Sequence, residues 1–339
     1  MQSRADIERA ISVVLVVSFP AAMYGIIQHY FLDPLPWVGD VTARVASTLG
    51  NSIFIGAFLI LTIPLALARL IQTTERVSVA MPKRAAPFLY LAAFATFLTF
   101  AAAWGLSFDL GAKNFIEANY SGTLTAPQLN ATSGAFALAL GLSLVGIALW
   151  WGAAFLLKQR AANFLLLALY AVLLAVQLVA LFFSQSRGPL LGLFGGLFAF
   201  FVLYALVRGA RKLALGAVGL ALGGMIFLAV LNVPNSPLEP LRELPYVGRL
   251  GRVFELEGGT GRVRVLIWQG ALKLILPHEA LWAPTTGDDV FNPLRPLVGY
   301  GPEAMYVAYN KFYPPELGTL ESRNATPDRS HNEMFDALV

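Results

Sequence analysis

Apolar runs separated by short polar turns fill the chain up to residue 231. The runs cover 9–28, 51–71, 86–106, 133–157, 163–183, 189–207 and 213–231. A helix needs about 20 mostly apolar residues to cross a hydrocarbon core of about 30 Å, and each run is close to that length. The pattern therefore predicts seven membrane-spanning helices and an all-α polytopic membrane protein.

Residues 232–339 differ from the runs before them, because they are rich in proline, glycine and charged side chains. This segment is large enough to form a subdomain of its own. Within it, apolar residues recur near helical spacing over 262–276, and Trp268 suits a membrane interface. An amphipathic helix lying on the bilayer surface is expected there, with Arg262 and Arg264 at its beginning.

Basic residues set the expected orientation in the membrane. The turns on one side hold only Arg44, Lys113 and Arg187. The N-terminus and the turns after the second, fourth and sixth runs hold Arg4, Arg9, Arg76, Lys83, Arg84, Lys158, Arg160, Arg208, Arg211 and Lys212. The positive-inside rule then predicts a cytoplasmic N-terminus and an extracytoplasmic loop subdomain over 232–339.

The composition agrees with a membrane protein, since 57% of the 339 residues are hydrophobic and 13% are charged. The absence of cysteine excludes disulfides and thiolate chemistry, and three histidines leave little for a metal site. Asp288 and Asp289 are adjacent and are expected in a solvated loop. We therefore expect no metal and no cofactor, and the sequence has no nucleic-acid-binding signature.

Arg187 is the first candidate for chemistry, because it stands in an otherwise apolar stretch between Ser186 and Gly188. Pro189 follows, so the side chain leaves a tight turn at the start of a helix, where backbone N–H groups also favour an anion. A guanidinium in that place predicts a phosphate site. The alternative is an arginine that anchors a helix end at the membrane surface. For Arg262 and Arg264 the alternative is contact with lipid phosphates.

The last residues read PDRSHNEMFDALV, over 327–339. Ser330 is expected to cap a helix that starts at His331, with Glu333 completing a capping box. A histidine on an outward loop beside arginines is a candidate general base, and the alternative is a structural role. His29 and His278 are weaker candidates.

Five motifs in this order resemble the O-antigen ligase and polymerase superfamily of bacterial envelopes. They read RVASTLGNSIF at 44–54, SRGPLLGL at 186–193, GRVRVLIWQGALKLI at 261–275, LVGYGPEAM at 297–305 and SHNEMFDAL at 330–338. The resemblance covers roughly residues 20–339.

The resemblance implies a GT-C-like helical bundle in the bacterial inner membrane, with its site on the outer face. Such an enzyme transfers a glycan from undecaprenyl pyrophosphate to a glycan, lipid or protein acceptor, without metal or nucleotide sugar. Carried over from the family, the site residues are Arg187, His331, and Arg264 or Arg262. Two guanidiniums would stabilise the leaving pyrophosphate, and the histidine would take the proton of the acceptor hydroxyl, with inversion.

Three other interpretations stay open at this point. A polysaccharide polymerase shares the fold and differs in its acceptor. A transporter of lipid-linked glycans would need polar residues along a path inside the spans, which here are almost uncharged. Family members continue past the histidine helix into further spans, so we also expect this chain to be a fragment or a truncated, non-catalytic relative.

Overall fold

The computed structural model of the protein divides it into two compact units, Met1–Leu250 and Gly251–Val339. The residues it describes are 3–35, 37, 41–79, 86–119, 123–156, 161–242, 248, 250–252, 259–283, 287–301, 303–321 and 326–339. The predicted boundary after residue 231 falls earlier than the observed one. The first unit extends to Leu250, and within it the Asn232 side chain donates to the Leu250 carbonyl at 2.8 Å.

Seven helices in the described part of the first unit are long and apolar enough to cross a membrane, which confirms the predicted polytopic, all-α membrane class. They are α1 (Arg4–His29), α2 (Ser52–Val79), α3 (Ala86–Gly111), α5 (Ala126–Leu156), α6 (Ala161–Ser184), α7 (Arg187–Arg208) and α8 (Arg211–Asn232). Short helices stand between and after them: η1 (Ser47–Leu49), α4 (Lys113–Asn119), α9 (Glu239–Arg242) and η2 (Leu250–Arg252).

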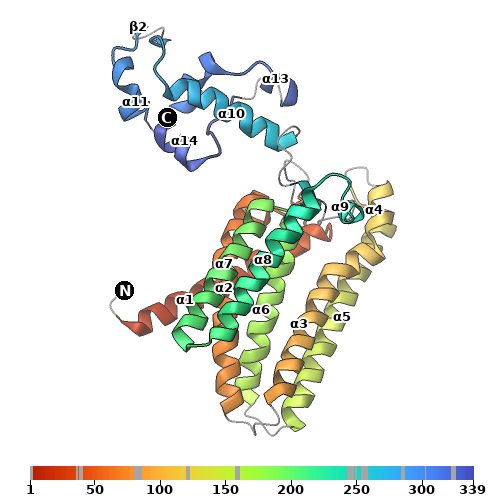
Figure 1. Ribbon diagram of the computed structural model, residues 1–339. Helices are drawn as coiled ribbons and strands as arrows, with labels where there is room; N and C mark the ends of the chain where they lie inside the picture. Colours follow the sequence, from red (N-terminus) through yellow and green to blue (C-terminus); the bar gives the residue numbers. More distant parts are fainter. Residues whose placement is uncertain are drawn as a thin grey trace. The chain divides into compact units, whose positions relative to one another are not determined.

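Helix α6 is the most buried of the seven and packs against α1, α2 and α3. Helix α3 runs along α5, and α7 packs between α2 and α8 (Figure 1). Large side chains fill the interior where α1, α3 and α6 meet, among them Tyr30, Trp104, Phe108 and Phe183. Exposed leucine, valine and phenylalanine side chains cover the outside of the bundle, as expected for a surface that faces lipid.

Polar contacts identify the two ends of this helical unit. At one end Arg69 pairs with Glu8, so the start of α1 meets the later part of α2. Arg208 pairs with Glu75 at 2.6 Å, so the end of α7 meets the same part of α2. At the other end the Val45 N–H donates to the Phe183 carbonyl at 3.3 Å. That bond joins the loop between α1 and α2 to the end of α6. The predicted orientation of these ends in a membrane stays a prediction, and Lys83, Arg84, Lys158 and Arg160 lie outside the described residues.

The second unit is built around α10 (Gly259–Ile275). After it come the strands β1 (Trp282–Ala283) and β2 (Gly287–Asp288), which pair antiparallel with Trp282 opposite Asp288. Short helices follow: η3 (Asn292–Leu294), α11 (Arg295–Val298), α12 (Met305–Ala308), η4 (Tyr309–Phe312), α13 (Leu317–Leu320) and α14 (Glu333–Leu338).

The structure has a helix, α10 (Gly259–Ile275), where the sequence predicted one over 262–276, and its placement on a bilayer surface stays a prediction. Its apolar face is covered by the rest of the second unit, and the shared core is made of Val263, Leu266, Ile267, Ala271, Leu274, Met305, Ala308, Tyr309, Leu317 and Val339. Gly270 lets Tyr309 pass close to the helix, since a Cβ there would lie 2.5 Å from the phenol oxygen. Periodicity predicted an apolar face, whereas the chain that folds back over it decided what covers that face.

The prediction for Asp289 is wrong, whereas Asp288 is exposed in β2. Asp289 accepts two hydrogen bonds from Arg295, at 2.7 and 3.1 Å, and both side chains are largely buried. The guanidinium of Arg295 lies 4.6 Å from the centre of the Tyr300 ring. These hydrogen bonds from Arg295 hold the pKa of Asp289 below its usual range.

Candidate functional site

A tight turn places Arg187 at the first residue of α7, as predicted. Helix α6 ends at Ser184, and Gln185 then adopts a left-handed conformation with φ of 48°. The buried Ser184 hydroxyl donates to the Leu181 carbonyl at 2.7 Å and accepts from the Ser186 N–H at 3.3 Å. The Ser184 hydroxyl thus stabilises the turn between α6 and α7. The Ser186 side chain makes no capping hydrogen bond to α7.

Close packing holds the first turn of α7 against α2. Pro189 lies over Gly56, where an added Cβ would come 2.7 Å from the proline Cγ. One turn further along α7, a Cβ on Gly192 would come 3.1 Å from Ile60. The position of Arg187 therefore depends on glycine and proline contacts between two helices that are distant in sequence.

Arg44 belongs to the same end of the helical unit, although sequence reasoning did not name it as a site residue. Its Nε atom is buried and has no hydrogen-bond partner. Burial lowers the pKa of Arg44, and the positive charge of Arg187 lowers it further. Two signals pointed to Arg44: it begins the motif at 44–54, and it is one of three basic residues expected on that side of the membrane.

The other predicted arginines stand near the beginning of α10, in the second unit. Arg262 makes a two-pronged ion pair with Glu316, with Nε–Oε1 and Nη2–Oε2 distances of 2.9 and 2.7 Å. Arg264 is exposed and makes no ion pair with another residue in the described part of the chain. Of the two alternatives that the sequence left open, Arg264 is the one whose guanidinium has no acidic partner there.

The turn that carries His331 differs from the prediction. Helix α14 begins at Glu333, and its N-cap is Asn332, whose side chain accepts from the Met334 N–H at 2.9 Å. Ser330 was expected to cap, which is wrong, because its buried hydroxyl donates to Asp336 at 2.6 Å. His331 is exposed just before the cap and has a left-handed φ of 56°.

Trp268 joins the His331 turn to α10. Its indole N–H donates to the Ser330 carbonyl at 2.9 Å, and its ring lies 6.2 Å from Phe335 of α14. Arg264 stands four residues before Trp268, so both lie on the same side of the helix. The second unit thus brings the helix of Arg264 to the turn of His331 through a contact that the sequence did not predict.

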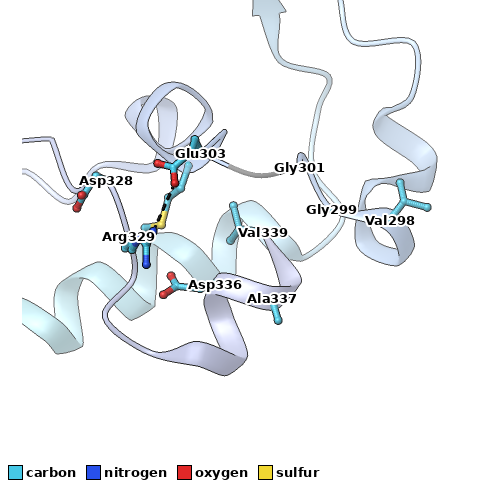
Figure 2. Close-up of a pocket in the computed structure, with 10 residues that line it drawn as sticks. Val298, Gly299, Gly301, Glu303, Asp328, Arg329, Asp336, Ala337 and Val339 are labelled. Carbon is cyan, nitrogen blue, oxygen red and sulfur yellow. Dashed lines mark hydrogen bonds and ion pairs between the residues drawn. The ribbon is translucent and has the colours of Figure 1, made fainter. Parts of the chain in front are cut away.

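A cavity of about 400 Å³ lies beside this turn, in the second unit. Its polar lining comes from Glu303, Asp328, Arg329 and Asp336. Arg329 pairs with Glu303, with an Nη2–Oε1 distance of 3.4 Å, and Figure 2 shows this ion pair. Asp336 also receives the two hydrogen bonds from Ser330, at 2.7 and 2.6 Å. Carboxylates in an open hollow are suitable acceptors for sugar hydroxyl groups.

The remaining histidines have structural contacts. His29 is buried, stacks on Phe183 with ring centres 3.7 Å apart, and has Nδ1 2.9 Å from the Thr42 carbonyl. His278 has Nε2 2.8 Å from the Tyr300 hydroxyl. Among the described residues, no three histidine, aspartate or glutamate side chains are grouped to hold a metal ion. The metal-free site stays a prediction.

The chain matches no protein-family model, no curated protein and no solved structure. What the fold defines is a class, a multi-pass helical membrane protein that carries a small folded C-terminal unit. The joint action of Arg187 with Arg264 and His331 stays a prediction from the sequence.

Proposed function

We propose that the chain is an O-antigen ligase-like glycosyltransferase of the bacterial inner membrane. It transfers a glycan from undecaprenyl pyrophosphate to the hydroxyl of an acceptor sugar, with inversion and without a metal ion. The observation that carries the proposal is the contact of Trp268 with the Ser330 carbonyl, because it ties the helix of Arg264 to the turn of His331. An exposed arginine and an exposed histidine are the groups that such a transfer needs.

The reaction is a single displacement at the anomeric carbon. The acceptor oxygen forms a bond to that carbon from one face, while the bond to the pyrophosphate oxygen breaks on the other. The electron pair of that bond leaves with the undecaprenyl pyrophosphate, and a ring nitrogen of His331 takes the acceptor proton. Arg187 and Arg264 stabilise the charge that develops on the leaving group.

In this proposal Arg264 binds the donor and Arg262 does not. Glu316 already occupies the guanidinium of Arg262 through two hydrogen bonds, so that side chain is committed to the fold of the second unit. The cavity lined by Asp328 and Asp336 is the place proposed for the acceptor sugar. In keeping with the positive-inside rule, the site belongs to the outer face of a GT-C-like bundle with a cytoplasmic N-terminus.

The test is glycan transfer by the purified full chain in lipid nanodiscs. A labelled undecaprenyl-pyrophosphate glycan is offered with a panel of acceptors and without added metal. Arg187→Lys and Arg264→Lys should each lower turnover by about 100-fold, or about 3 kcal/mol, because an ammonium lacks the planar fork that holds two phosphate oxygens. His331→Ala should keep donor binding and lose turnover.

Arg262→Lys is the matched control, because it makes the same change in the same helix two residues from Arg264. It should keep transfer, since Arg262 pairs with Glu316 and does not bind the donor. Chains of repeated units in place of a single transfer would identify a polymerase. The proposal fails if the wild-type protein neither transfers nor hydrolyses the donor. It fails equally if EDTA abolishes transfer and magnesium restores it.

A further inference from the structure

We infer that Arg44 is a second anion-binding residue at the turn that carries Arg187. The two guanidinium groups together bind a phosphate or pyrophosphate group. The sequence motifs gave Arg44 no such role. The inference rests on the proposed function only for the identity of its ligand, the pyrophosphate of a lipid-linked donor. Its physical basis is the way in which the loop between α1 and α2 is held.

Three hydrogen bonds, to Gln28 and Phe183, hold the backbone that follows Arg44 in the loop between α1 and α2. The Gln28 side-chain oxygen accepts from the Ala46 N–H at 3.2 Å and from the Ser47 N–H at 2.7 Å. The Val45 N–H donates to Phe183, one residue before the end of α6. Arg44 therefore leaves a fixed backbone beside the turn of Arg187.

The guanidinium groups of Arg44 and Arg187 carry like charges, and an anion bound to both would reduce the repulsion between them. Like charges that lie close together in a partly buried place repel each other, and Arg187 lowers the pKa of Arg44 through that repulsion. In the described part of the chain no carboxylate pairs with Arg44. Lys113, the remaining basic residue expected on this side, pairs with Asp109 at 3.1 Å.

A structural role for Arg44 would look different. An arginine that stabilises a loop donates its N–H groups to carbonyl oxygens, whereas the Arg44 Nε is buried without a partner. Leaving a buried donor unsatisfied costs stability, and an anion that accepts from it removes that cost. The two roles thus predict opposite effects when the side chain is replaced by an uncharged one of similar length.

The experiment measures thermal unfolding and ligand affinity of the full chain in phosphatidylcholine nanodiscs. Inorganic pyrophosphate is titrated at constant ionic strength. Wild-type protein should gain melting temperature with pyrophosphate. Arg44→Met should melt at the same or a higher temperature without ligand and should bind pyrophosphate at least about tenfold more weakly.

Two further variants make the result specific. Arg187→Met should show the same loss, and the double variant should lose little more, because both residues bind one anion. Arg211→Met removes an exposed arginine from the opposite end of α7 and α8 and should bind as the wild type does. Nanodiscs with phosphatidylglycerol distinguish a phospholipid head group from a free pyrophosphate as the bound anion.

Unchanged pyrophosphate affinity in Arg44→Met would overturn the inference, and so would a lower melting temperature with unchanged affinity. Transfer activity is measured on the same preparations. If pyrophosphate binding depends on Arg44 while transfer is absent, the inference holds and the proposed function fails. If transfer is present and insensitive to Arg44→Met, only the inference fails.

Discussion

At the scale of single residues, His331 is held by its neighbours rather than by a helix. Its backbone is left-handed, a conformation that residues other than glycine adopt at a cost and that recurs at functional sites. The buried Ser330 before it and the capping Asn332 after it fix both sides of the turn. The exposed imidazole is thereby carried by a turn whose neighbouring residues are hydrogen-bonded on both sides.

Replacement of Trp268 by phenylalanine tests that support. The change keeps an aromatic ring beside Phe335 but removes the hydrogen bond to the Ser330 carbonyl. We expect a loss of about 1 kcal/mol in the stability of the second unit and a fall in kcat with little change in donor KM. Unfolding curves and steady-state transfer kinetics measure these effects. Trp282→Phe, at an exposed position of β1, is the control, and full turnover in Trp268→Phe would contradict the prediction.

At the scale of elements, the contact between α2 and α7 decides where Arg187 lies. Small residues let the two helices approach closely, as is common between helices in membranes. Gly56 leaves the space that Pro189 occupies, and Pro189 follows Arg187 by two residues. The helix packing and the proposed anion site are therefore one structural feature.

Replacement of Gly56 by alanine should push the first turn of α7 away from α2, because the new Cβ would lie 2.7 Å from the proline ring. Overpacking of this kind costs about 1–3 kcal/mol. We expect a lower melting temperature and weaker pyrophosphate binding. Gly195→Ala on α7, where a Cβ meets nothing within 4 Å, should change neither. Wild-type binding by Gly56→Ala would show that Arg187 does not depend on this contact.

At the scale of the whole molecule, the distribution of basic residues predicts the orientation of the chain. Reporter fusions at Lys83, Lys158 and Lys212 should read as cytoplasmic, and a fusion near Asp288 should read as exported. The physical reason is that basic turns resist translocation. An exported reading at Lys212 would contradict the orientation and, with it, the assignment of Arg187 to the outer face.

The seven spans and the helix α10 could be predicted from the amino-acid sequence. Both are local properties, since a span needs only enough consecutive apolar residues to replace water with lipid, and an amphipathic helix needs only their spacing. The start of α7 at Arg187 followed in the same way from the turn residues around it.

The contacts between segments that are distant in the sequence could not be predicted, because they depend on how the chain folds. Ser330 and Asn332 are both residue types that cap helices well. Asn332 is the N-cap of α14, because the Ser330 hydroxyl donates to Asp336 and the Ser330 carbonyl accepts from Trp268. Arg262 and Arg264 look alike in sequence, and Glu316 distinguishes them. Arg44 lies beside Arg187 because Gln28 and Phe183 pin its loop. Each outcome depends on which partner the fold brings within hydrogen-bonding distance, and no local pattern contains that information.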